Sequence, residues 1–127
     1  MKAKNETGKI VPNGVRIEKH EYETVLFLTE QGFDVELIPP KNSRSADLIM
    51  DGITWEMKCP RGSGERTIEK LFQKALHQSV NLIFDLRKIA LHGEKARKQT
   101  VRQFELRRSV KRLIIITKTG KILDMKR

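Results

Sequence analysis

Asp51-Gly52 lies between two apolar-rich runs, and this dipeptide constrains the fold more than any other part of the chain. A two-residue Asp-Gly turn joins adjacent antiparallel strands and fixes their register. Counting outward from the turn predicts four cross-strand pairs: Met50–Ile53, Ile49–Thr54, Leu48–Trp55 and Asp47–Glu56. Because side chains alternate along a strand, one face of this hairpin is predicted to be a core face: Leu48, Met50, Ile53, Trp55 and Met57.

The other face of the hairpin carries two acids and a lysine. Asp47 and Glu56 are predicted to stand opposite each other, about 5 Å apart at Cβ, an arrangement that is destabilising for like charges. A hard divalent cation bound by the two carboxylates would remove this repulsion. We therefore predict a divalent-metal site, for Mg²⁺ or alternatively Mn²⁺ or Zn²⁺, with Lys58 stabilising a phosphoryl transition state. The alternative interpretation is a surface hairpin with an ordinary salt bridge.

A third metal ligand is expected from the helix predicted over residues 16–31, whose apolar spacing involves Tyr22, Val25, Leu26 and Thr29. Glu21 lies on the same face as Val25 and Leu28, whereas Glu23 lies about 130° from the apolar centre and is the weaker candidate. His20 is a candidate substrate contact, with an ordinary surface histidine as the alternative. The lone thiol, Cys59, is predicted to be structural.

The remaining elements follow from periodicity and turn residues. Residues 1–15 are polar and are predicted to be a flexible arm, followed by a single domain over residues 16–127. Ser63 is predicted to cap a helix whose apolar stripe ends at Val80. Further strands are predicted over 33–38, 82–86, 113–117 and 121–125, and a basic helix over 94–110. The order predicts an α/β fold with a mixed sheet flanked by helices.

The charge is segregated along the chain. The net charge is +10, yet residues 1–86 hold 12 basic and 13 acidic residues and residues 87–127 hold 14 and 3. This pattern predicts a nucleic-acid partner, with a solvated basic face as the alternative. The candidate contacts are the glycine-rich turn at Ser63, residues of the following helix and part of the basic helix: Arg66, Thr67, Lys70, Lys74, Gln78, Arg97, Lys98 and Arg102. No apolar run reaches the length of a membrane span, and no signal peptide follows Met1.

The αβββαβ order with Asp47 and Glu56-Met57-Lys58 resembles the PD-(D/E)XK nuclease superfamily. The resemblance implies a restriction-endonuclease-like core, here extended by a C-terminal helix and hairpin. It also implies that the acids, including Glu21 on the first helix, bind metal and that the lysine assists catalysis. Ala46 departs from the superfamily pattern, which has proline before the first acid.

Three segments, starting at His20, Ala46 and Lys111, are similar to the C-terminal nuclease domains of CdiA toxins of contact-dependent growth inhibition. This narrower resemblance implies metal-dependent cleavage of tRNA in the cytoplasm. For toxin versions, it also implies delivery within a larger secreted protein and an immunity protein that blocks the site. A DNA endonuclease with the same metal site and a catalytically silent nucleic-acid-binding module are the alternatives.

Overall fold

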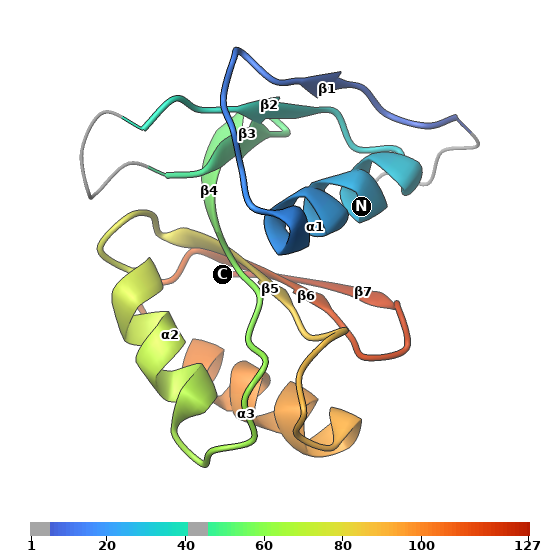
Figure 1. The fold of residues 1–127 in the computed structure, drawn as a ribbon. Coiled ribbons are helices and arrows are strands. Elements are labelled where there is room, and N and C mark those ends of the chain that lie inside the picture. Colours follow the sequence, from blue (N-terminus) through green and yellow to red (C-terminus); the bar gives the residue numbers. More distant parts are fainter. Residues whose placement is uncertain (1–5, 41–45) are drawn as a thin grey trace.

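The computed structural model of the protein describes residues 6–40 and 46–127. Its strands are β1 (Ile10–Val11), β2 (Val35–Leu37), β3 (Leu48–Met50), β4 (Ile53–Lys58), β5 (Asn81–Asp85), β6 (Arg112–Ile116) and β7 (Ile122–Lys126). Its helices are α1 (Lys19–Glu30), α2 (Thr67–Ala75) and α3 (Gly93–Leu106). The strands form one mixed sheet in the order β1-β2-β3-β4-β5-β6-β7 (Figure 1). The predicted α/β class with helices on both sides of a mixed sheet is confirmed.

The hairpin formed by β3 and β4 has the predicted turn and three of the four predicted pairs. Asp51 and Gly52 have φ of 53° and 78°, the left-handed conformation that this two-residue turn requires. The antiparallel ladder pairs Met50–Ile53, Ile49–Thr54 and Leu48–Trp55. The fourth pair is wrong, because the Asp47 N–H donates to the Trp55 carbonyl at 2.9 Å and the ladder ends at Leu48.

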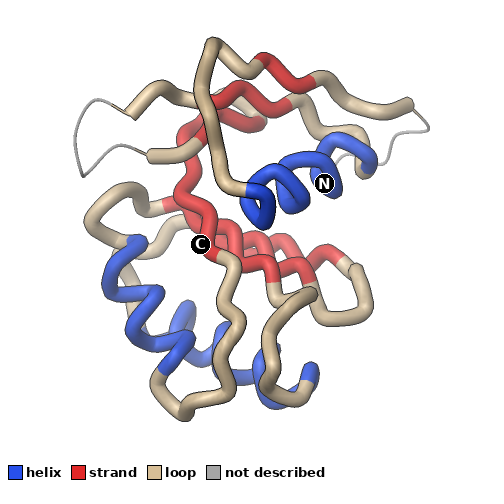
Figure 2. The backbone as a smooth tube through the Cα atoms, in the orientation of Figure 1, coloured by secondary structure: helices blue, strands red, loops and turns tan. Residues whose placement is uncertain are grey.

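Two apolar cores cover the two faces of the sheet. β4, β5 and β6 are parallel, so the connections through α2 and α3 cross over one face of the sheet. The core on that face includes Ile68, Phe72 and Phe104. The core on the other face surrounds α1 and includes Val25, Leu28 and Trp55. Figure 2 shows α1 on one side of the β5–β7 region, with α2 and α3 on the other side.

The buried face of α1 differs from the predicted one. Tyr22 and Leu26 are exposed by 47% and 39%, whereas Thr24, Val25, Leu28 and Thr29 are buried. The helix is rotated away from the orientation that its apolar residues alone predict, because the Thr24 hydroxyl donates to the buried Asp85 carboxylate at 2.6 Å. Glu21 is half-buried and lies on the same face of α1 as the buried Val25, one turn away.

Other boundaries also needed correction. Residues 1–5 of the predicted arm lie outside the described residues, but residues 10 and 11 form β1, which pairs in parallel with β2. The Gly8 N–H also donates to the Thr29 carbonyl at 2.7 Å, so this part of the arm is held against the domain. Ser63 does not cap α2, which begins four residues later at Thr67 and ends at Ala75. Val80 therefore lies beyond the helix and is 43% exposed.

No helix in the described part of the chain is both long enough and apolar enough to cross a membrane.

Candidate active site

Asp47 lies immediately before β3 and is held by hydrogen bonds on three sides. Its N–H donates to Trp55, its carbonyl accepts from the Ile38 N–H at 3.0 Å, and its Oδ2 accepts from the Met57 N–H at 2.9 Å. The last contact replaces a backbone ladder bond with a carboxylate contact. Asp47 is therefore fixed against β4 by its side chain, beside Glu56 rather than paired with it through the backbone.

Glu56 is buried, with 4% of its surface exposed. Alternation along the hairpin predicts only that its side chain points to the other face of β4 from Trp55 and Met57. It pairs with Leu82 of β5, whose side chain belongs to the core under α2 and α3. Its Oε2 lies 3.2 Å from Lys58 Nζ. Its Oε1 is buried with no hydrogen-bond partner in the described structure. A buried carboxyl oxygen without a partner is costly, so this atom is a candidate ligand for a metal ion.

The electrostatics of the site centre on Glu56. Burial, and then the negative charge of Asp47, raise the pKa of the Glu56 carboxyl to about 8, against the opposing effect of Lys58. Lys58 is half-buried, with 20% of its side chain exposed. The structure thus brings together Asp47, Glu56 and Lys58, the three hairpin residues of the predicted site.

Glu21 approaches this group from α1. It lines a cavity of about 140 Å³ together with Asp47, Ile38 and Pro40. Its Oε1 also accepts from the Glu18 N–H at 3.0 Å, which completes a capping box at the start of α1. Among the described residues, the predicted ligands Glu21, Asp47 and Glu56 do not form a group whose ligand atoms all lie within 4.8 Å of one another.

His20, the predicted substrate contact, lies beside Glu18. Its Nδ1 is 3.3 Å from Glu18 Oε2, and its side chain is 30% exposed. Within the described residues, the set Glu18, His20 and Glu21 has ligand atoms that all lie within 4.8 Å of one another. This arrangement places His20 at the start of α1, near Glu21.

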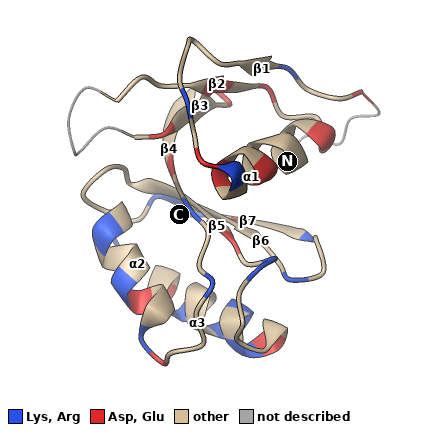
Figure 3. Ribbon diagram, viewed as in Figure 1, with Lys and Arg blue, Asp and Glu red and all other residues tan. Residues whose placement is uncertain are grey.

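The predicted nucleic-acid contacts fall into two groups, one on and around α2 and one on α3, and both helices carry Lys and Arg residues (Figure 3). On and around α2, Lys70 and Lys74 are exposed, and Thr67 and Gln78 are half-buried. Arg66 is exposed, but its guanidinium is engaged with Glu69 at 3.2 Å. Ser63 is exposed in the preceding loop. Because Glu56 and Lys58 pair with Leu82 and Phe84, whose side chains pack under α2, this group is on the same side of the sheet as Glu56 and Lys58.

The second group is on α3. Lys98 and Arg102 are exposed and line a surface hollow of about 470 Å³ that also includes His92 and Lys95. Arg97 is half-buried and forms an ion pair with Glu94 at 3.0 Å. The pair reduces the charge that Arg97 can offer to a phosphate, so Lys98 and Arg102 are the stronger candidates on this helix.

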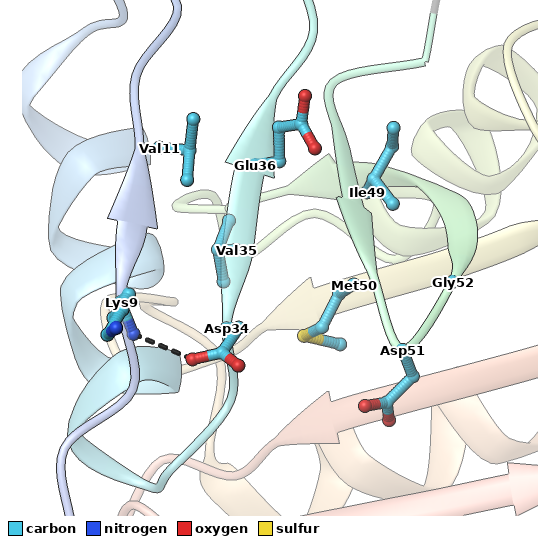
Figure 4. Close-up of a pocket in the computed structure, with 9 residues that line it drawn as sticks. All are labelled: Lys9, Val11, Asp34, Val35, Glu36, Ile49, Met50, Asp51 and Gly52. Atoms are coloured by element: carbon cyan, nitrogen blue, oxygen red, sulfur yellow. Dashed lines mark hydrogen bonds between the residues drawn. The ribbon is translucent and has the colours of Figure 1, made fainter.

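A further hollow, of about 380 Å³, lies on the β1–β3 part of the sheet (Figure 4). Its lining includes the carboxylates of Asp34, Glu36 and Asp51 beside Val11 and Ile49. The main-chain N–H of Lys9 donates to Asp34 Oδ1 at 2.9 Å. Carboxylates around an open hollow repel phosphate groups, so this surface is not a candidate for the nucleic-acid backbone.

The sequence analysis missed a buried polar cluster beside the site. Asp85, at the end of β5, is 5% exposed and accepts hydrogen bonds from Thr24 and Arg87. Burial raises the pKa of Asp85, but these hydrogen bonds outweigh it, so the net pKa lies below its ordinary value. A charged residue inside the apolar run LIFDL, followed by an arginine two positions on, was the available signal.

The comparisons with known proteins agree on one family. A family profile described as the contact-dependent growth inhibition CdiA C-terminal domain matches residues 44–122. A solved structure titled "CdiA-CT/CdiI toxin and immunity complex from Burkholderia pseudomallei" contains a similar chain, with a TM-score of 0.71 and 17% identity. The match covers 94% of this chain and 100% of that chain, and it shows a shared fold. No curated protein matches the chain.

Proposed function

The chain belongs to the contact-dependent growth inhibition CdiA C-terminal domain family, and on this premise we propose that it is a metal-dependent nuclease that cleaves tRNA. One observation carries the nuclease assignment. The buried Glu56 carboxyl lies beside Asp47 and Lys58, with one oxygen that has no partner in the described structure. The same three residues carry the resemblance to the PD-(D/E)XK superfamily. The choice of tRNA over DNA rests on the resemblance to CdiA nuclease domains.

The residues fit a hard divalent cation such as Mg²⁺. This ion is commonly bound by one or two carboxylates and retains several waters, which suits Asp47 and Glu56, with Glu21 lining the same cavity as Asp47. The unpartnered Glu56 Oε1 supplies a ligand atom, and the raised pKa means that the carboxyl releases its proton when a cation binds. Mn²⁺ and Zn²⁺ accept oxygen ligands as well, so both belong in the test.

The proposed mechanism divides the work among the residues of this site. A bound cation supplies an activated water and neutralises charge on the phosphoryl oxygens. Asp47 is oriented by the Met57 N–H, so its carboxylate needs no reorganisation. Lys58 Nζ, which is paired with Glu56 in the free protein, donates to a phosphoryl oxygen and stabilises the developing negative charge. Lys70, Lys74, Lys98 and Arg102 hold the phosphate backbone outside the site.

A protein partner is proposed on separate grounds. The similar Burkholderia pseudomallei chain was solved as a toxin and immunity complex. We propose that this chain also binds an immunity protein, and that it acts in the cytoplasm after delivery within a larger secreted protein. Its net charge of +10 favours an acidic partner surface.

Cleavage assays with two substrates test the nuclease proposal. The full chain is incubated with total tRNA or with plasmid DNA, in Mg²⁺, Mn²⁺, Zn²⁺ or EDTA. We expect metal-dependent cleavage of tRNA, with a loss on the order of 100-fold in Glu56→Gln, because removing a metal ligand removes several kcal/mol of transition-state stabilisation. Glu69→Gln is the matched control, since it makes the same change at an acid outside the site.

The outcomes separate the alternatives. Cleavage of plasmid but not of tRNA would reassign the substrate to DNA. Salt-sensitive binding without cleavage in any of the three metals would identify a catalytically silent nucleic-acid-binding module. A Glu56→Gln protein that cuts as fast as the parent would refute the assigned site.

A further inference from the structure

A single buried hydroxyl connects α1 to the carboxyl ends of β4 and β5. Thr24 is fully buried, and its Oγ1 donates to Asp85 Oδ2 at 2.6 Å. The same oxygen lies 3.2 Å from Cys59 Sγ. Because the hydroxyl has one hydrogen, and Asp85 takes it, the Cys59 thiol is the donor in the second contact. Burial raises the pKa of this thiol to about 11, so it keeps its hydrogen at neutral pH.

Arg87 extends these contacts along the same helix. Its guanidinium binds both oxygens of Asp85, with Nε at 3.0 Å from Oδ1 and Nη2 at 2.8 Å from Oδ2. Nη2 also donates to the Glu23 carbonyl at 3.1 Å, and the guanidinium lies 4.4 Å from the centre of the Phe27 ring. Asp85 and Arg87 together therefore hold α1 at Glu23, Thr24 and Phe27.

This cluster is one helical turn from the proposed metal site. Glu21 precedes Thr24 by three residues on α1, and Cys59 directly follows Lys58 on the chain. Glu21 and Asp47 both line the cavity of about 140 Å³, so a small shift or rotation of α1 changes the separation of these two carboxylates. We propose that Thr24, Asp85 and Arg87 are positioning residues that set Glu21 against Asp47 for cation binding, an inference that rests on the proposed function.

The chemistry of the cluster favours positioning over simple stabilisation. Burying an ion pair such as Asp85–Arg87 brings little net stability, because the desolvation of both charges offsets their attraction. What the pair does provide is direction, since a bidentate guanidinium fixes the orientation of its partner. The directed contacts converge on the turn of α1 that follows Glu21.

Cation binding measured by calorimetry on the full chain tests the proposal. Thr24→Val keeps the shape and removes the hydroxyl, and we expect the dissociation constant for Mn²⁺ to rise about tenfold, as for residues that orient metal ligands. Thr24→Ser keeps the hydroxyl and should bind within about twofold of the parent by the same reasoning. Thr100→Val is the matched control, because Thr100 is also a fully buried helical threonine whose Oγ1 donates at 2.7 Å, there to Ala96 in α3.

Each result decides between the readings. Weaker Mn²⁺ binding in Thr24→Val, with parent-like binding in Thr24→Ser and Thr100→Val, supports positioning. A lower melting temperature in Thr24→Val with unchanged Mn²⁺ binding overturns it and leaves a structural role only. A parent chain that binds no divalent cation refutes the proposed function and this inference together. Should Thr24→Val not fold, Arg87→Lys decides by the same measurement, because a lysine cannot bind both oxygens of Asp85.

Discussion

Glu56→Gln should stabilise the metal-free protein at neutral pH although it removes a proposed metal ligand. In the folded chain, burial and the charge of Asp47 raise the pKa of Glu56 from 4.5 to about 8. Between these values the folded state binds more protons at this carboxyl than the unfolded state does. The stability that the parent gains from holding this proton is therefore fully present below pH 4.5, and the parent loses it as the pH rises toward 8. Glutamine has nearly the same shape and does not titrate.

The size of the effect follows from the pKa difference. Each pKa unit corresponds to about 1.4 kcal/mol, so at pH 7 the ionisable carboxyl costs the metal-free fold on the order of 3 kcal/mol relative to a neutral group. Glu56 is buried, and solvent screening of this cost is weak. Loss of the contact between Glu56 and Lys58 in the variant offsets part of the gain.

Urea unfolding of the parent and of Glu56→Gln, in EDTA at pH 5, 6, 7 and 8, measures the difference directly. The parent should lose stability across this range, whereas the variant should change little and become the more stable protein at pH 7. Glu69→Gln should retain the slope of the parent, because the contact with Arg66 lowers the pKa of the half-buried Glu69 carboxyl below 4.5 and out of this window. Parallel pH profiles for parent and Glu56→Gln would refute the reasoning about Glu56.

Two further predictions concern catalysis and substrate binding. Lys58→Met should leave Mn²⁺ binding within about threefold of the parent while lowering the cleavage rate on the order of 100-fold, because the ammonium acts on the phosphoryl group rather than on the cation; calorimetry and single-turnover cleavage measure the two effects. Replacing Lys98 and Arg102 together by serine should weaken tRNA binding and reduce its dependence on salt by about one to two released counterions; binding titrations at several salt concentrations measure this, and an unchanged slope would contradict the assignment of α3 to the phosphate backbone.

The hairpin could be predicted from the sequence because its register depends on a local signal. Asp51-Gly52 adopts the left-handed turn, and three cross-strand pairs follow from it by counting. Such turn chemistry involves few residues and little tertiary context. The apolar alternation that marks Trp55 and Met57 as core residues is equally local, and both are buried. The strands predicted over residues 113–117 and 121–125 also rest on local patterns, and they form the antiparallel pair β6–β7.

The burial of Glu56 could not be predicted in the same way. Alternation places its side chain opposite the core face, which in an isolated hairpin is the solvent face. In the protein β4 also pairs with β5, and the chain returns through α2 over that second face. The burial, and with it the shift in pKa, is a property of the assembled sheet. The rotation of α1 has a similar origin, since the partner of Thr24 lies 61 residues away at Asp85.

The register of β4 matters because one face of this strand packs under α1 and the other carries residues of the proposed metal site. Trp55, Met57 and Cys59 face the core under α1, where Cys59 contacts the Thr24 hydroxyl. Glu56 and Lys58 alternate with them on the other face, beside Asp47 and the side covered by α2. A slip of one residue exchanges the two faces along the whole strand, which would bring the acid and the lysine under α1. The Asp51-Gly52 turn therefore does more than close a hairpin, because the proposed metal site and the attachment of α1 both depend on the register that it sets.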